Sequence, residues 1–126
     1  MSWRQRLQQS PSNAEMAVML ELQKRQLLTH MRSQHAFIFD LKEDLVAGTF
    51  IDFYWTEPHN YAVFIDGIQV HNKVRQSMRD ECVQKALERR GVKVDRFVYT
   101  PPLRKWRLRE ICDRIENVLR SWQLNK

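Results

Sequence analysis

Three segments of the chain repeat their apolar residues at the spacing of an α-helix. The first covers about 13–32, and Ser12 and Glu15 have the spacing of a capping box at its start. The second covers 73–90 and stops before Gly91, a residue typical of the position just past a helix end. The third follows the two prolines of "YTPP" and continues nearly to the end of the chain. We therefore predict three amphipathic helices.

Between the helices the apolar pattern changes to a period of two, with β-branched and aromatic residues bounded by turn residues. Four segments show this pattern: 36–41, 48–55, 61–66 and 92–100. The predicted order is therefore α-β-β-β-α-β-α, an α/β fold with a mixed four-stranded sheet flanked by helices. We expect a single domain over 1–126, with 1–11 as a basic N-terminal arm.

The charge of the chain indicates what kind of partner the protein binds. The net charge is +6 and the isoelectric point is about 9.7, and a field of this sign attracts polyanions such as nucleic acid. The alternative is charge that serves solubility alone. Cys82 and Cys112 have no metal-ligand spacing, and we expect both to be partly buried. The apolar runs are too short for a membrane span, so we expect a soluble, cytoplasmic protein.

Five polar residues are candidates for chemistry, and each has a simpler structural interpretation. Asp52 is predicted to share one strand face with Phe50 and Tyr54, while Ile51, Phe53 and Trp55 share the other. It is either paired with an arginine or a ligand of a cation. Asp66 precedes a glycine and fits a turn. His71 fits a surface or packed histidine, Asp80 fits a solvated helix residue, and the capping box already explains Glu15. Asp52, Asp66 and His71 together form a set able to bind a divalent ion and transfer a proton.

In their order, Glu15, Asp52 in "IDFYW", His71 in "FIDGIQVH" and Asp80 in "RDECVQKALERRGVKVDRFVY" resemble the very short patch repair endonucleases and related homing endonucleases. The resemblance covers about 10–99 and implies a restriction-endonuclease-like fold. It implies that Asp52 is the main ligand of Mg²⁺ (or Mn²⁺), helped by a backbone carbonyl near residue 65. It also implies that His71 transfers the proton, that Asp80 orients it, and that Glu15 completes the site.

The chain also departs from the pattern of those repair enzymes. They have a histidine at the position of Asp66, whose carboxylate is more similar to the second acid of the broader PD-(D/E)xK nucleases. Asp66 is then either a second metal ligand or a turn cap, and Ile68 replaces the lysine of that pattern. The aromatic wedges and structural zinc ligands of the repair enzymes are also missing. We therefore expect a nuclease without mismatch specificity.

Basic residues near these motifs are candidates for contacts with the DNA backbone. Lys73 and Arg75 follow the histidine motif, and Arg104 and Arg107 lie in "PPLRKWRLRE". Trp106 among them either stacks on a base or packs in the core, and we favour the core.

The sequence therefore favours a Mg²⁺-dependent endonuclease acting on duplex DNA, with RNA and branched DNA left open as substrates. Since one chain carries one set of candidate residues, cutting both DNA strands would need a homodimer or two successive binding events. The alternatives are a catalytically inactive nucleic-acid-binding module of the same fold, in a defence or mobile-element system, and a basic protein-interaction domain.

Overall fold

The computed structural model describes residues 13–42, 45–68 and 73–124, with side chains described over 13–38, 49–68 and 81–123. The elements in chain order are α2 (Asn13–Lys24), β1 (Met31–Lys42), β2 (Leu45–Trp55), β3 (Tyr61–Gly67), α3 (Lys73–Arg89), β4 (Lys93–Tyr99) and α4 (Lys105–Leu124). This order and the four-stranded mixed sheet confirm the predicted fold class. Within the described residues, no helix combines the length and apolarity that crossing a membrane requires.

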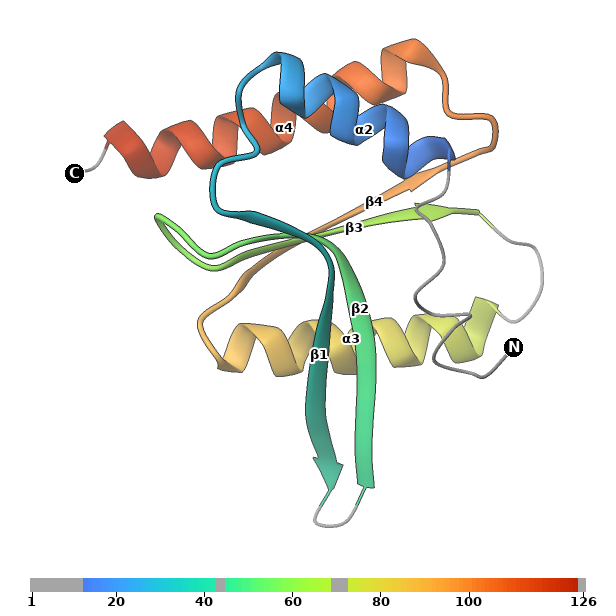
Figure 1. Cartoon of the computed structure of the whole chain (residues 1–126). Helices are drawn as coiled ribbons and strands as arrows, with labels where there is room; N and C mark the ends of the chain where they lie inside the picture. Colours follow the sequence, from blue (N-terminus) through green and yellow to red (C-terminus); the bar gives the residue numbers. More distant parts are fainter. Residues whose placement is uncertain (1–12, 43–44, 69–72, 125–126) are drawn as a thin grey trace.

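The sheet has the strand order β1-β2-β3-β4. The first two pairings are antiparallel, and β3 pairs with β4 in parallel through the connection that contains α3. Helices α2 and α4 cover one face of the sheet and α3 covers the other (Figure 1). The molecule is therefore a three-layer α/β/α arrangement.

Each helical layer encloses its own apolar cluster against the sheet. The α2–α4 cluster consists of Val18, Leu22, Phe53, Trp55, Tyr61, Val63, Ile65, Phe97, Ile111, Cys112, Ile115, Val118 and Leu119. The α3 cluster consists of Ile51, Ala62, Phe64, Val83, Leu87 and Val92. Strand β3 contributes alternate residues to the two clusters because both of its faces are covered.

The β1–β2 hairpin changes the face on which it packs. Met31 and Trp55, at one end, pack with the α2–α4 cluster, whereas Phe37 and Ile51, further along, belong with the α3 cluster. Strict alternation would keep residues four or six positions apart on one side. The prediction that Ile51 shares a face with Trp55 is therefore wrong. In Figure 1 the distal half of the hairpin leaves β3 and runs past α3.

Helix α2 ends eight residues before the predicted end, and β1 begins earlier than expected. Gln26 has a φ of 61°, and the Leu27 N–H donates to the Leu22 carbonyl while the Gln26 N–H donates to that of Gln23. These two bonds form a Schellman motif. Gly91, with a φ of 79°, ends α3 in the same way, as predicted. The end of α2 was missed because glutamine is not the residue that this motif favours.

Other expectations for the fold have mixed outcomes. Cys112 is fully buried, but Cys82 is exposed, so the prediction that both are partly buried is wrong. The face of α4 predicted to be apolar does face the core. Ser12 of the predicted capping box and the basic arm over 1–11 lie outside the described residues.

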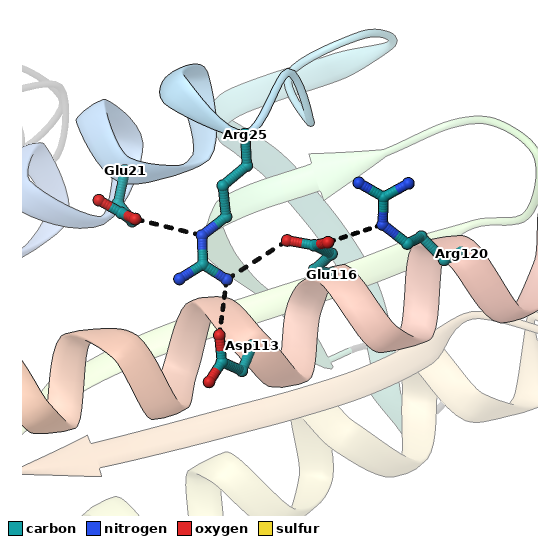
Figure 2. A network of polar contacts seen from close by, with 5 residues as sticks. All are labelled: Glu21, Arg25, Asp113, Glu116 and Arg120. Atoms are coloured by element: carbon teal, nitrogen blue, oxygen red, sulfur yellow. Dashed lines mark hydrogen bonds and ion pairs between the residues drawn. The ribbon is translucent and has the colours of Figure 1, made fainter.

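An ionic network joins α2 to α4 above the apolar cluster (Figure 2). The Arg25 guanidinium lies 2.7 Å from Asp113, 3.2 Å from Glu21 and 3.3 Å from Glu116. Only 19% of the Arg25 side chain is exposed, so its interactions are less screened than those of a surface pair. One half-buried cation therefore links the two helices of this layer.

We expect Arg25→Ala to lower the free energy of unfolding by about 1 to 2 kcal/mol, between the values for exposed and buried ion pairs. Lys85→Ala, which removes the exposed pair with Glu81, is the control and should change stability by less than ~0.5 kcal/mol. Urea denaturation measures both. Equal effects of the two substitutions would contradict a linking role for Arg25.

Candidate functional site

Three carboxylates from three elements gather at one end of the sheet. Glu15 lies in the first turn of α2, Asp52 in β2 and Asp66 near the end of β3. The Gln34 amide of β1 bridges two of them, since its Nε2 donates to Glu15 Oε2 at 2.8 Å and to Asp52 Oδ1 at 3.4 Å. The structure thus brings together three of the predicted site residues, and it gives Glu15 a partner on a neighbouring strand.

Gln34 adopts a backbone conformation that is unusual within a strand. Its φ is 51°, and the pairs recorded between β1 and β2 pass from Ser33–Phe53 to His35–Ile51, leaving out Gln34 and Asp52. A left-handed conformation costs a residue other than glycine roughly 1 to 2 kcal/mol. The site therefore lies where the hairpin changes faces, and strain of this kind is typical of functional sites.

The carboxylate of Asp52 replaces a missing backbone contact between two strands. Pairing of β2 with β3 stops at Phe53–Val63, and beyond it Asp52 Oδ2 accepts a hydrogen bond of 2.7 Å from the Ile65 N–H. The predicted role of a carbonyl near Ile65 as a metal ligand stays a prediction. Asp52 thereby lies beside the carboxyl end of β3, within the charge field of Asp66.

Burial raises the pKa of Asp52 to about 6. The Ile65 N–H opposes this shift, and the negative charge of Asp66 adds to it. Gln34 and Arg96 favour the ionised form to a smaller extent. Asp52 is therefore a carboxylate whose charge is incompletely compensated.

Asp66 has an arginine as its ion-pair partner. One interpretation of the sequence gave such a partner to Asp52 instead. Arg96 Nη1 of β4 lies 2.6 Å from Asp66 Oδ2, and the guanidinium carbon lies 4.2 Å from the centre of the Phe64 ring. An ion pair and a cation–π contact therefore hold this arginine against the sheet. The turn-cap interpretation does not account for this pairing.

Tyr99, the last residue of β4, forms a further wall of the site. It is the register partner of Gly67, and a Cβ added at Gly67 would lie 3.2 Å from the Tyr99 hydroxyl. Burial raises the pKa of Tyr99, and the charges of Glu15, Asp66 and Asp52 raise it further. A neutral phenol beside three carboxylates can donate a hydrogen bond to an oxygen of a ligand.

Of the other predicted catalytic residues, His71 lies outside the described residues, and Asp80 lies in α3 without a described side chain. Lys73 and Arg75 likewise lie in the first turn of α3 without described side chains. Helices α2, α3 and α4 all begin at the end of the sheet where β3 and β4 end (Figure 1). Lys73, Arg75 and Asp80 therefore belong to a helix that begins at the same end as the carboxylates.

The predicted DNA contacts on α4 differ in how they are held. Arg104 is exposed just before the helix. Arg107 donates from Nη2 and Nε to the Val98 carbonyl, at 2.9 and 3.2 Å, and also pairs with Glu110 at 3.5 Å. Its donors therefore connect α4 to β4. Trp106 is 65% exposed, so the prediction that it packs in the core is wrong.

The donor chemistry of the site fits a hard divalent cation. Two carboxylates with room for water and phosphate oxygens are the usual protein contribution to a Mg²⁺ site. The contacts of Asp52 are two uncharged N–H donors, so a bound cation would stabilise its ionised form. Within the described ranges, no three histidine, cysteine, aspartate or glutamate side chains could hold a metal ion by themselves. A cation here would therefore depend on ligands beyond these carboxylates.

Sequence reasoning missed Gln34, Arg96 and Tyr99. Tyr99 carried a usable signal, because the carboxyl ends of two parallel strands meet at one edge of a sheet. Gln34 carried none, since a glutamine in a strand pattern gives no indication of a left-handed backbone.

Comparison of the chain with protein-family models, with curated proteins and with solved structures finds no match in any of the three. The functional argument therefore depends on the chemistry of the site.

We expect Asp52→Asn to stabilise the fold at neutral pH by about 1 to 3 kcal/mol, because each unit of pKa shift corresponds to ~1.4 kcal/mol. The folded state binds this proton more tightly than the unfolded chain does. Wild-type stability should therefore fall as the pH rises from the ordinary value of 3.8 to about 6. The advantage of the variant should disappear toward the lower of these values.

Urea denaturation at a series of pH values measures this difference, with Glu88→Gln on the exposed face of α3 as the control. A stability difference between Asp52→Asn and wild type that is the same at all pH values would contradict a costly charge on the partly buried Asp52.

Proposed function

We propose that this protein is a metal-dependent endonuclease that hydrolyses phosphodiester bonds of DNA. The observation that carries the proposal is the convergence of Glu15, Asp52 and Asp66, from α2, β2 and β3, with the pKa of the partly buried Asp52 raised to about 6. Keeping such a charge in a strained hairpin costs stability, and proteins tolerate that cost at functional sites. The resemblance to the very short patch repair endonucleases, which includes Asp52 and Glu15, supports the same assignment.

In this proposal Asp52 and Asp66 hold a Mg²⁺ ion. When bound, the ion supplies electrostatic stabilisation of the charge that develops on the phosphate during hydrolysis. The Gln34 amide fixes the orientation of the Asp52 and Glu15 carboxylates. Arg96 limits the repulsion between Asp52 and Asp66 through its ion pair with Asp66.

Proton transfer is assigned to His71, as the resemblance implies, with Asp80 as its orienting carboxylate. Histidine suits this role because its ordinary pKa lies near neutral pH. Tyr99 supports the site as a hydrogen-bond donor that stays protonated, since the surrounding carboxylates oppose its ionisation.

The electrostatics of this end of the molecule favour a polyanion. The described helices α2, α3 and α4 begin there, and the partial positive charge at a helix start attracts phosphate. Lys73 and Arg75 belong to the first turn of α3, and Arg104 precedes α4. Since one chain has one set of carboxylates, cutting both strands would require two chains or two binding events. A homodimer is consistent with that requirement.

A second candidate is a nucleic-acid-binding module of the same fold without catalytic activity. The observation in its favour is that the carboxylates already have protein partners: Arg96 for Asp66, and Gln34 with the Ile65 N–H for Asp52. Such a module would keep the basic surface and would bind DNA without cleaving it.

Wild-type protein should convert supercoiled plasmid to open-circle or linear DNA with Mg²⁺ or Mn²⁺. Asp52→Asn and His71→Ala should each reduce the rate ~100-fold or more, the scale of loss for a general acid–base residue or an electrostatic contribution. Agarose electrophoresis of the plasmid over time gives the rates.

Glu88→Gln, on the exposed part of α3, is the matched carboxylate control and should cleave as fast as wild type. If plasmid remains intact with both metals while a gel shift still shows DNA binding, the inactive module replaces the nuclease. Residual cleavage that persists equally in both site variants would indicate a contaminating nuclease.

DNA affinity should fall steeply with salt. If Lys73, Arg75 and Arg104 each neutralise one phosphate, affinity for duplex should drop ~40-fold between 50 and 200 mM salt, from a slope of about −0.9 per contact. Arg104→Ala should make the slope shallower by about 0.9. Lys93→Ala, at the opposite end of β4, should leave it unchanged. A flat response in fluorescence anisotropy titrations would exclude phosphate contacts as the source of binding.

A further inference from the structure

An apolar surface lies beside the carboxylates and is not used by the core. Trp106 is 65% exposed, and Ile68 and Val98 are each 45% exposed. With Tyr99, Pro101 and Arg104 they line a surface hollow of about 280 Å³. Exposed apolar side chains that gather in one place indicate a binding surface more often than scattered ones do.

The packing of α4 does not require Trp106 to be a tryptophan. The buried side of this helix consists of Ile111, Cys112, Ile115, Val118 and Leu119. Trp106 precedes Ile111 by five positions, which corresponds to a rotation of roughly 140° away from that residue on a helix with 3.6 residues per turn. The indole therefore projects away from the apolar cluster that α4 covers.

The residues around Trp106 are cationic. The run "RKWRLR" over 104–109 contains four basic residues and no acidic one, and the first turn of α4 has no acidic residue. Cations at a helix start oppose the helix dipole, so helix stability does not explain them. Arg107 is held by the Val98 carbonyl, whereas Arg104 is exposed at the edge of the hollow. An aromatic side chain beside an exposed arginine matches a base with its phosphate.

Tyr99 connects this hollow to the candidate site. It lines the hollow, and its carbonyl accepts a hydrogen bond of 2.8 Å from the Ile68 N–H. Its hydroxyl also experiences the charges of Glu15, Asp66 and Asp52. Tyr99 therefore borders both the hollow and the carboxylates. A nucleic acid with one phosphate at the carboxylates would pass over Tyr99 to reach Trp106.

We propose that Trp106 and this hollow bind one unpaired base of a nucleic acid, with Arg104 contacting the adjacent phosphate. The volume is at the lower limit for ligand pockets, ~300 Å³, which suits a single base better than a larger ligand. A base inside a duplex has no free face for stacking, so the ligand is a single strand, a single-stranded end or a junction with unpaired bases. The inference depends on the proposed function for the nature of the partner, and it narrows the substrate class.

Fluorescence anisotropy with a labelled oligothymidylate, in EDTA to prevent cleavage, tests the inference. Trp106→Ala should weaken binding ~5-fold to ~150-fold, the range found when a stacking aromatic is replaced by alanine. Trp106→Phe should retain most of the affinity, because it keeps an aromatic face. Leu20→Ala removes another exposed apolar side chain, 53% exposed on α2, and should have no effect. A blunt duplex should bind Trp106→Ala as well as it binds wild type.

Two further ligands separate a base from other partners. A strand of the same length without bases keeps the phosphates, so Trp106→Ala should not weaken its binding. The inference is overturned if Trp106→Ala binds oligothymidylate like wild type, or loses the same factor on the strand without bases. It is also overturned if polyglutamate displaces oligothymidylate as well as unlabelled oligothymidylate does, because the surface then selects an acidic partner by charge.

The proposed nuclease and the base site can fail separately. If the protein cleaves plasmid but Trp106→Ala binds oligothymidylate like wild type, the proposed base site is wrong and the proposed nuclease still holds. Absent cleavage combined with the expected loss of binding would remove the nuclease and leave the base site.

Discussion

Asp52 connects two strands at the point where their backbone pairing ends, and much of the molecule depends on that contact. The regular backbone hydrogen bonds between β2 and β3 end before Ile65. The Asp52 carboxylate accepts the hydrogen bond from the Ile65 N–H in their place. The hairpin is then able to leave β3 and cover α3, while its base remains packed under α2 and α4. One carboxylate therefore supports the architecture and contributes the central charge of the candidate site.

This double use explains why the site is unfavourable for stability by itself. The hairpin changes faces through the left-handed Gln34. The Asp52 carboxylate beside it is partly buried, and this desolvation opposes its ionisation. Both features cost free energy, and the surrounding layers compensate for them. The Arg25 network and the two apolar clusters hold α2, α4 and the sheet in register around the strained segment. A rigid frame of this kind is what a precisely oriented pair of carboxylates requires.

The end of the molecule that carries the carboxylates also carries the starts of α2, α3 and α4, the basic run at α4 and an exposed indole. Three independent features that suit phosphates and bases thus surround acidic residues that suit a cation. This combination is more informative about function than the net charge of the chain, because charge alone also serves solubility.

The sequence by itself determined the order of elements, because helical and strand periods reflect which side chains must be buried. Gly91, the apolar face of α4 and the carboxylates Asp52 and Asp66 were also identified from residue type and spacing, whereas Glu15 was identified as a site residue only through the family resemblance. The end of α2 at Gln26, the change of face at Gln34 and the partners Arg96 and Tyr99 were decided only by the tertiary structure. The change of face and the two partners depend on contacts between residues far apart in the chain, and no local pattern encodes such contacts. The end of α2 is a local turn, but a glutamine does not signal its left-handed backbone. Trp106 shows the same limit in reverse: its size favours burial, but its position on α4 directs it to solvent.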